Sequence, residues 1–488
     1  MKNIKCARIY SIEIRGMKNI LEGMLDFYSE SQLKSDPNCL NSHIYGIYGP
    51  NGTGKTGVIE ACKILKTIFS GHLPDEDAYS QLKKVLKKYI NSTTKKLFIE
   101  VKMYFEIDQA PVFYDYAITF DNSDGQLYIS SEILKSKNKS EGEWERWKTI
   151  FSYSDDLLYS NEINKRAAVE DPLSFQIHTL RKTASLTSVL MNPLFLESLK
   201  MFESADFINI KKMSVDSLKI KKIEDAIETL RCFSEFYMVV IGADHFNMIS
   251  GGAVPLFITS DDPKNYLYGQ LPLLSLESAR SSAPAEAFNS FKILFDQVNI
   301  ILQTLVPGTI LELKNLQKIK QANAPDIIEY ECVSKHGDNE CSLCCESEGI
   351  KRLICLINTF IAFTSNPSYC LFIDSFDSCI FEHVFGTLLE SLETCGKGQL
   401  IFTAHNLYGL EKLPYKQIIF STENPKNRFE CQSAIMTNDY RIAYFRNLIL
   451  GKEKGESLGS IPMASEFRNA FRKANRCNFN TCHKTPNE

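Results

Sequence analysis

Apolar and polar positions along the chain follow two different periods, and the change between them predicts the order of the first elements. Residues 7–14 alternate as a strand does, and residues 43–48 form a continuous apolar strand. Residues 57–69 instead place apolar side chains three or four positions apart, as one face of a helix does. A glycine-rich stretch separates the second strand from this helix, and residues 30–41 are predicted to form a charged loop.

The middle of the chain changes from strands to a mostly helical pattern. Residues 96–107 and 112–120 are strand-like and are separated by four residues, 108–111, which predicts a hairpin. The helical pattern then runs from about residue 155 to residue 299, with its clearest stretches at 223–233 and 285–305. Residues 278–284 are rich in Ser, Ala and Pro and are predicted to be a hinge or loop.

The last third returns to alternating strands and helices. We expect a helix at residues 349–363 and strands at 309–313, 327–333, 370–374 and 399–403. The fold class is therefore predicted to be α/β, with a nucleotide-binding fold that is split along the chain. Its parts are an N-terminal half of the head at 1–135, a mostly helical insertion at 136–305, a C-terminal half at 306–455 and a basic tail at 456–488.

Composition changes this picture little. The 488 residues are 44% hydrophobic and 23% charged, which is ordinary for a soluble globular protein of two lobes, or of one domain with an insertion. A net charge of -4 gives no overall attraction to nucleic acid, so such binding would need a local basic patch. The apolar run 353–373 is interrupted by polar residues and a proline, and the N-terminus lacks the apolar region of a signal peptide. A cytoplasmic location without membrane contact is expected.

Fifteen cysteines, mostly among apolar neighbours, are predicted to be reduced core residues rather than a disulfide framework. One cluster stands apart and consists of Cys332, His336, Cys341, Cys344 and Cys345. Its C-x-x-C pair has the spacing of a zinc knuckle, but no second pair completes it unless the distant Cys477, Cys482 and His483 fold back. Zinc binding and ordinary strand and loop cysteines both remain open.

The glycine-rich stretch at residues 49–56 matches the phosphate-binding pattern G-x-x-x-x-G-K-[ST]. It lies between an apolar strand and a helix, so its backbone N–H groups can surround a phosphate at the positive end of the helix. Lys55 would reach the β- and γ-phosphates of ATP, and the Thr56 hydroxyl would bind Mg²⁺. The predicted nucleotide-binding residues here are Gly49, Asn51, Gly52, Thr53, Gly54, Lys55 and Thr56.

A P-loop requires an acidic partner for the metal at the end of another buried strand, and Asp374 meets this requirement. It would face the same Mg²⁺ as Thr56. The next residue is Ser375, where most such ATPases have a glutamate that polarises the attacking water. Asp377 and Glu382 are nearby candidates, but neither occupies that position, so hydrolysis is expected to be slow or absent while binding persists.

Two further segments carry groups suited to a phosphate. Ser347 and Gly349 open the helix that leads to Asp374 and offer a hydroxyl and a helix N-terminus, although the same residues are also a good capping sequence. The strand 399–403 is followed by His405, which could contact the γ-phosphate or serve only a structural role.

The order of these four elements resembles the ATP-binding-cassette-like heads of the SMC, RecF and OLD-type ATPases. In that resemblance residues 49–56 are Walker A, 347–349 the signature, 371–374 Walker B and His405 the switch histidine. Residues 374–382 and 398–406 and the segment 444–451 are also similar to a bacterial AAA-type subfamily of phage-defence operons. That subfamily includes the ATPase subunits of PARIS-like and abortive-infection systems.

The resemblance implies a homo-oligomer, at least a dimer, in which two copies share each ATP site. ATP would lie between Lys55, Thr56 and Asp374 of one copy and Ser347 and Gly349 of the other, with Asp377 and His405 as further catalytic candidates. It also implies a separate effector, such as a Toprim nuclease, controlled in response to a phage-encoded trigger. Only about 80 residues follow His405, too few for such a nuclease domain.

Two alternatives remain open. A RecF- or SMC-like head of DNA repair would bind duplex DNA through basic surfaces, for which the lysine clusters at 83–88, 95–96, 211–222 and 468–484 are candidates. A nonhydrolysing scaffold would use ATP only to stabilise an assembly, as the serine at position 375 allows.

Overall fold

The computed structural model describes the greater part of the chain. The described residues are 2–35, 43–71, 76–154, 157–159, 188–192, 217–250, 255–259, 268–272, 280–321, 325–431 and 464–476, without 109, 124, 141, 189 and 287. The segment 444–451 and the residues Cys477, Cys482 and His483 lie outside this part.

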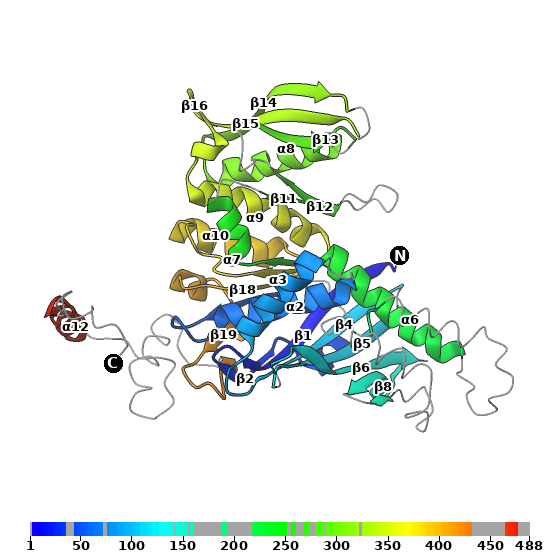
Figure 1. The fold of residues 1–488 in the computed structure, drawn as a ribbon. Helices are drawn as coiled ribbons and strands as arrows, with labels where there is room; N and C mark the ends of the chain where they lie inside the picture. The colour runs from blue at the N-terminus through cyan, green and yellow to red at the C-terminus, as the bar shows by residue number, and fades with distance from the viewer. Residues whose placement is uncertain are drawn as a thin grey trace.

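An antiparallel sheet of eight strands forms one end of the molecule (Figure 1). Its order is β2-β1-β4-β5-β6-β8-β9, and β7 pairs with β6. The strands are β1 (Ile4–Met17), β2 (Ile20–Asp26), β4 (Lys96–Ile107), β5 (Ala110–Asp121), β6 (Tyr128–Ser140), β7 (Glu143–Trp144), β8 (Lys148–Ser154) and β9 (Leu157–Tyr159). The predicted hairpin is confirmed as β4 and β5, which pair along their whole length.

A second sheet contains three of the predicted strands, at residues 43–48, 370–374 and 399–403, and three strands that the sequence did not predict. Its order is β10-β17-β18-β3-β19-β20, and all neighbours are parallel except β19 and β20. The strands are β3 (His43–Tyr48), β10 (Met238–Ile241), β17 (Cys370–Ile373), β18 (Gln399–Thr403), β19 (Ile418–Ser421) and β20 (Phe429–Cys431). Since parallel strands end at the same edge, the residues that follow β3, β17 and β18 come together there.

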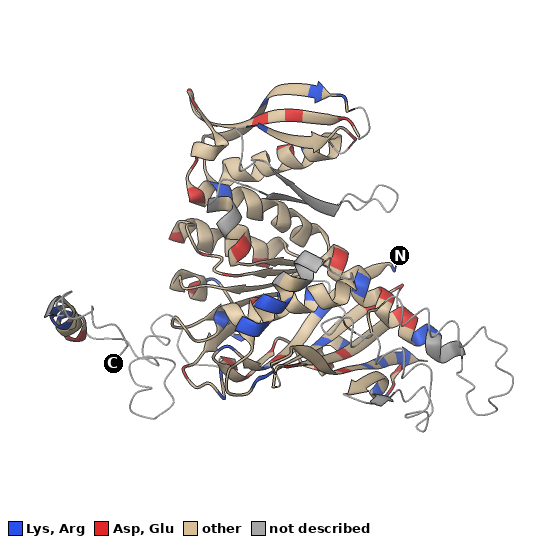
Figure 2. Ribbon diagram, in the orientation of Figure 1, with Lys and Arg blue, Asp and Glu red and all other residues tan. Residues whose placement is uncertain are grey.

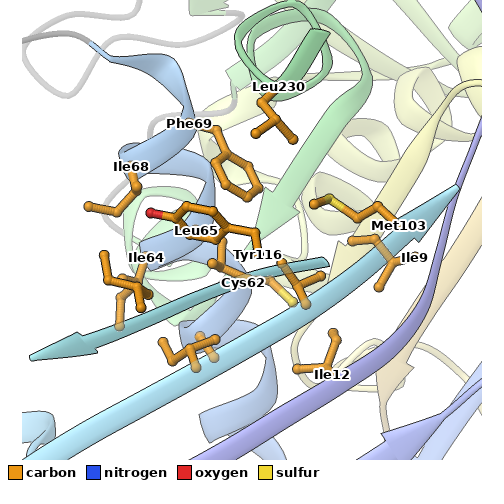
Figure 3. Packing of buried hydrophobic residues seen from close by; sticks show 14 of the residues in the cluster. Ile9, Ile12, Cys62, Ile64, Leu65, Ile68, Phe69, Met103, Tyr116 and Leu230 are labelled. Atoms are coloured by element: carbon orange, nitrogen blue, oxygen red, sulfur yellow. The ribbon is translucent and has the colours of Figure 1, made fainter. Parts of the chain in front are cut away.

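Helix α2 (Lys55–Ser70) lies in a core that both sheets share. Its apolar face contacts the antiparallel sheet, as Figure 3 shows for Cys62, Leu65 and Phe69 against Ile9, Ile12, Met103 and Tyr116. The rings of Phe69 and Tyr116 meet edge to face at 4.9 Å. The same cluster includes Phe372 and Ile401 of the parallel sheet, so burial of this helix connects the P-loop to both sheets.

Two polar contacts also join the sheets. The guanidinium group of buried Arg8 in β1 donates to the carbonyls of Pro367 and Lys397, the latter at 2.7 Å. Gln399 in β18 pairs with the backbone of Ile9, accepting at 2.8 Å and donating at 2.7 Å. These contacts place β1 against the loops that precede β17 and β18.

The other side of the parallel sheet is covered by helices and a small sheet. Figure 1 shows this small sheet and the eight-stranded sheet at opposite ends of the molecule. The helices are α7 (Ala243–Ser250), α8 (Phe288–Leu305), α9 (Glu348–Ser365) and α10 (Glu382–Cys395); the small sheet has the order β13-β15-β14, with β16 on β15. Its strands are β13 (Arg280–Pro284), β14 (Thr309–Ile319), β15 (Ile327–His336) and β16 (Asn339–Ser342).

The remaining elements are helices, a hairpin and short helical turns, and one of these helices, α6, packs into the same core as α2. They are the helices α1 (Glu30–Ser35), α3 (Glu76–Tyr89), α6 (Ser217–Cys232) and α12 (Ala464–Arg476), the hairpin β11 (Pro255–Thr259) and β12 (Tyr268–Pro272), and the turns η1 (Phe233–Tyr237), η2 (Leu343–Cys345), η3 (Leu407–Glu411) and η4 (Tyr415–Gln417). No helix in the described ranges has the length and apolar character needed to cross a lipid bilayer.

The structure corrects the prediction of a mostly helical middle segment. The described part of residues 136–305 contains α6, α7 and α8 but also strands of four different sheets. β10 belongs to the P-loop sheet itself, and residues 280–284 of the predicted hinge form β13. Strands β10 and β13 are short and pair with β17 and β15, which are far away in sequence, so local periodicity did not reveal them. The boundaries at 135 and 305 remain a proposal.

Candidate nucleotide-binding site

The P-loop connects β3 to α2 and requires glycine at three positions. Gly49, Gly52 and Gly54 have φ values of 151°, 79° and 91°, which residues with a Cβ atom rarely adopt. A Cβ on Gly49 would also clash with Ser421, which follows from the close approach of β3 and β19. The chain can therefore turn sharply and direct the N-terminus of α2 at the pocket, as expected from the sequence.

Lys55 is buried within its own loop. Its ammonium group donates to the carbonyls of Gly49 at 2.6 Å and Pro50 at 2.8 Å. Desolvation by burial lowers its pKa to about 8, against the opposing charges of Asp374 and Asp377. The charged and neutral forms of the Lys55 amine are therefore similarly populated in mildly alkaline solution. An anionic phosphate would favour the charged form.

Asp374 follows β17 directly and meets Thr56 from the start of α2. The Thr56 hydroxyl donates to its carboxylate at 3.2 Å, although the two residues are 318 positions apart. A second hydroxyl, that of Thr403 at the end of β18, donates to the same carboxylate oxygen at 2.6 Å. One carboxylate and one hydroxyl at this separation are oxygen donors of the kind that Mg²⁺ takes beside a nucleotide phosphate.

A pocket of about 300 Å³ opens over the P-loop, at the lower end of the range for ligand sites. Its lining joins the P-loop to the turn between β1 and β2 and to the ends of β17 and β18. The lining residues are Lys18, Asn19, Ile20, Asn51, Gly52, Thr53, Gly54, Lys55, Thr56, Gly57, Ser375, Thr403 and His405. Of the candidates from sequence, Gly49, Asp374, Asp377, Glu382, Ser347 and Gly349 do not line it, although Asp374 accepts hydrogen bonds from two lining residues, Thr56 and Thr403.

His405 lines the pocket, and Asp377 positions it. The Asp377 carboxylate accepts hydrogen bonds from the backbone N–H groups of His405 at 3.0 Å and Asn406 at 2.7 Å. Desolvation, and next the charge of Lys55, lower the pKa of His405, which keeps the imidazole neutral at pH 7. Asp377 therefore supports the loop after β18 and does not line the pocket, while Glu382 is exposed at the start of α10.

Ser375 occupies the place of the expected glutamate. It lines the pocket with a φ of 49°, and its N–H donates to the Thr403 hydroxyl at 2.7 Å. Its carbonyl accepts from Arg352 of α9 at 3.3 Å. The lining contains no acidic side chain among the described residues, so nothing in it matches the missing base.

Ser347 and Gly349 lie at the exposed start of α9. The Ser347 hydroxyl accepts from the N–H of Ile350 at 3.3 Å, which confirms that it caps the helix. A Cβ on Gly349 would clash with the carbonyl of Cys379, in the loop after Walker B. Any role of these residues in phosphate binding thus requires a nucleotide held by another copy.

Sequence reasoning missed Lys18, Asn19, Ile20 and Thr403. The first three form the turn between β1 and β2, where the Asn19 amide donates to the carbonyl of Gly52 and Ile20 packs over Gly54. A lysine and an asparagine in a tight turn belong to no sequence motif that predicts contact with the P-loop, since only sheet pairing places them over it.

The cysteine cluster does not form a metal site in the described part of the chain. Glu346 contacts both His336 and Cys341, the latter with the thiol 3.5 Å from the carboxylate, and Cys344 and Cys345 lie together instead. No three His, Cys, Asp or Glu side chains of the described residues could bind one metal ion.

The comparisons with known proteins agree with this arrangement. A family model described as an AAA domain matches residues 11–238. That range runs from β1 to the first residue of β10 and contains the P-loop. A comparison with curated protein sequences finds no match.

Several solved structures match this chain at low sequence identity. They include an Smc head domain with an extended coiled coil bound to the C-terminal domain of ScpA from Pyrococcus furiosus, at 13% identity over 92% of this chain and 100% of that chain with a TM-score of 0.37. The SMC head domain from Thermotoga maritima has 14% identity over 88% and 100%, with a TM-score of 0.33. The Smc head domain with a coiled coil and joint from Pyrococcus yayanosii has 12% identity over 88% and 97%, with a TM-score of 0.40.

Because these scores are low, the fold assignment depends on the strand order, the P-loop and the position of Asp374. These three features define an α/β fold whose P-loop sheet is built from segments far apart along the chain, the split arrangement that the sequence predicted.

ATP binding is expected to be accompanied by proton uptake at Lys55. A pKa of about 8 leaves about half of these amines uncharged at pH 8 and about a tenth uncharged at pH 7. Phosphate binding favours the charged form, so binding should take up about half a proton at pH 8 and about a tenth at pH 7. Calorimetry in buffers of different ionisation enthalpy measures this uptake. Equal uptake at the two pH values would contradict the prediction.

Proposed function

We propose that the protein binds ATP·Mg²⁺ in this pocket and that the bound ATP joins two copies of the chain. One observation carries the proposal: the P-loop and His405 line one pocket beside Asp374, which accepts a hydrogen bond from the lining residue Thr56, whereas the exposed Ser347 and the partly buried Gly349 do not line it. A signature that cannot reach its own nucleotide remains available for the nucleotide of a second copy. Each ATP would then be enclosed by two chains.

Different residues at the pocket would bind different parts of ATP·Mg²⁺. Lys55 leaves the carbonyls of its own loop and binds the β- and γ-phosphates, and the N–H groups at the start of α2 surround the β-phosphate. Thr56 and Asp374 bind Mg²⁺, which neutralises charge on the phosphates. A neutral His405 can donate one N–H to the γ-phosphate, while Asp377 fixes its backbone.

Turnover is expected to be slow. The pocket has no acidic side chain in the position from which a glutamate polarises water, and Ser375 cannot act as a general base at neutral pH. The protein would therefore remain in its ATP-bound, associated state for long periods. Conformational control by ATP occupancy, rather than rapid hydrolysis, would be its main output.

Replacing Ser347 by aspartate is expected to prevent ATP-dependent dimer formation without weakening ATP binding. Aspartate still caps α9, but its charge would face the γ-phosphate of the other copy. Sedimentation velocity with and without ATP·Mg²⁺ should show at least about a tenfold loss of dimer affinity, the effect of roughly 1.4 kcal/mol. ATP affinity of the single chain should be unchanged, because this serine does not line its own pocket.

Ser347→Asn is the matched control, since asparagine caps a helix equally well and carries no charge. It should form dimers far better than the aspartate variant. Dimers of undiminished stability in Ser347→Asp, or a wild-type protein that stays monomeric with saturating ATP, would remove the shared-site proposal.

We further propose that this ATP-controlled head is a subunit of an anti-phage defence complex. The similarity of residues 374–382 and 398–406 to ATPases of phage-defence operons supports this role. In such a complex a phage-encoded trigger would change ATP-dependent association, and a separate effector such as a Toprim nuclease would act. Binding of the product of a neighbouring gene, compared between wild type and a variant that does not bind ATP, tests this role.

A second candidate function is ATP-dependent DNA binding, as in a RecF- or SMC-like repair protein. Figure 2 shows Lys and Arg along α3, whose four lysines at 83, 84, 87 and 88 occupy one 14-residue helix. This surface could contact DNA phosphates despite the net charge of -4. DNA retention that requires ATP and falls steeply with salt would favour this function over the defence subunit.

A further inference from the structure

Exposed thiols gather at the start of α9. Of the eleven cysteines whose side chains the structure describes, four are exposed: Cys344, Cys345, Cys379 and Cys395. The first two form the end of the turn η2, immediately before Glu346 and Ser347. The backbone carbonyl of Cys379 lies against Gly349, and its sulfur lies 3.9 Å from the guanidinium group of Arg352 in α9.

Cys344 and Cys345 are arranged to react with one another. Their sulfur atoms lie 3.7 Å apart, and the sulfur of Cys344 lies 3.2 Å from the hydroxyl of Ser342. The hydrogen bond to Ser342, and further the contacts with Cys345 and the charge of Lys351, lower the pKa of the Cys344 thiol. Cys344 thus has the larger thiolate fraction of the pair, and the Cys345 sulfur, 3.7 Å away, is within reach of a disulfide that Cys344 forms.

From this geometry we infer that Cys344 and Cys345 form a reversible thiol-modification site for low-molecular-weight disulfides such as oxidised glutathione. The Cys344 thiolate attacks one sulfur of the disulfide, forms a mixed disulfide and expels one thiolate. Cys345 then attacks the Cys344 sulfur, forms a bond between the two cysteines and expels the second thiolate. The two cysteines lose two electrons and two protons, and the small disulfide is reduced to two thiols.

The product would distort the turn that presents the signature. Adjacent Cα atoms are about 3.8 Å apart, below the separation of about 4.4–6.8 Å that most disulfides span. The oxidised turn must therefore change its backbone, and its bond should be easily reduced. η2 is coupled to α9, because Lys351 donates to the carbonyl of Cys344 at 2.8 Å and Ser347 follows two residues after Cys345. Oxidation would thus displace Ser347 from the position in which it caps α9.

The consequence for the assembly rests on the proposed function. If Ser347 and Gly349 complete the ATP site of a second copy, oxidation of this turn would prevent the two copies from associating when ATP is bound. Both copies would still bind ATP in their own pockets, whose lining contains none of these cysteines.

The full-length protein, treated with oxidised glutathione and analysed by peptide mass spectrometry, tests the site. We expect wild type to lose two hydrogen atoms, or to gain a glutathione, in the peptide that contains residues 344–345, with full reversal by dithiothreitol. The variant Cys344→Ser/Cys345→Ser should lack this change, and Cys395→Ser, which removes the exposed thiol at the end of α10, should retain it. A pair that stays reduced while Cys395 is modified would overturn the inference.

Two further measurements on the same samples test the coupling. Oxidation should accelerate hydrogen exchange of the Ile350 amide about fivefold, the effect of losing a helix cap, and should abolish ATP-dependent dimers until the thiols are reduced. Unchanged exchange, or undiminished dimers of the oxidised protein, would contradict it. If the reduced wild-type protein forms no dimers with ATP, the proposed function fails. Hydrogen exchange at the Ile350 amide then still decides whether oxidation of the two thiols changes the turn before α9.

Discussion

Lys55→Ala is expected to lower the affinity for ATP by about 100-fold, because it removes the charged donor that contacts two phosphates, worth roughly 2–3 kcal/mol. The loss is expected whether or not the protein hydrolyses ATP. The fold should persist, since the carbonyls of Gly49 and Pro50, which accept from Lys55, lie beside an open pocket that water can enter. Equilibrium dialysis with labelled ATP, together with thermal unfolding of the ligand-free protein, measures both quantities.

Lys63→Ala is the matched control on the same helix. This lysine pairs with Asp244 at 2.6 Å on the surface and does not line the pocket, so ATP affinity should remain within about twofold of wild type. A normal affinity in Lys55→Ala would place the nucleotide elsewhere and refute the site.

The same two variants test whether ATP controls a complex. Each is co-purified with the product of the neighbouring gene, and the defence-subunit proposal predicts that Lys55→Ala changes the recovery of that partner while Lys63→Ala does not. If no form of the protein binds the neighbour, the defence role is rejected. Loss of binding only in Lys55→Ala would show that nucleotide occupancy governs the assembly.

Ser375→Glu is expected to raise ATP turnover by about 100-fold over wild type, the contribution of a well-placed general base. The substitution places a carboxylate directly after Asp374, at a residue whose side chain already lines the pocket. Ser375 has a φ of 49°, so any residue with a Cβ has a similar backbone cost there, and glutamate should add little to it. Steady-state phosphate release with saturating ATP·Mg²⁺ is the measurement.

Ser375→Gln provides the control, because it has the same shape without a basic carboxylate. Its turnover should stay at the wild-type level. If the glutamate variant gains nothing over glutamine, the absence of that carboxylate is not what limits hydrolysis. If wild type already turns over ATP rapidly and Lys55→Ala abolishes this, the nonhydrolysing scaffold is excluded.

Much of the fold could be predicted from local pattern. The strand before the P-loop is confirmed at His43–Tyr48, the strand before His405 at Gln399–Thr403, and the helix after the P-loop at Lys55–Ser70. These elements are strongly apolar and are bounded by glycine or polar residues, so their burial and period are evident from the residues alone. The short strand β10 and the strand β13 were missed, since each is specified by distant partners and not by its own few residues.

Of the residues at the candidate site, only those that belong to a sequence motif could be predicted. Gly49 and Lys55 carry a pattern whose chemistry is local, and Asp374 follows a buried strand in the way a metal ligand should. The contacts of Asp377 with the backbone N–H groups of His405 and Asn406 could not be predicted, because they are known only from the folded chain. Thr403 gave no indication of its contact with Asp374.

The sequence by itself determined that the P-loop, Asp374 and His405 each follow a buried strand, because each of these placements depends on residues adjacent in the chain. Only the tertiary structure decided which of them share a pocket, because parallel pairing brings the ends of β3, β17 and β18 to one edge of the sheet. It also decided that the turn at Lys18 and Asn19 covers the P-loop and that Ser347 does not. Such contacts join residues hundreds of positions apart, and their geometry depends on the packing of both sheets around α2.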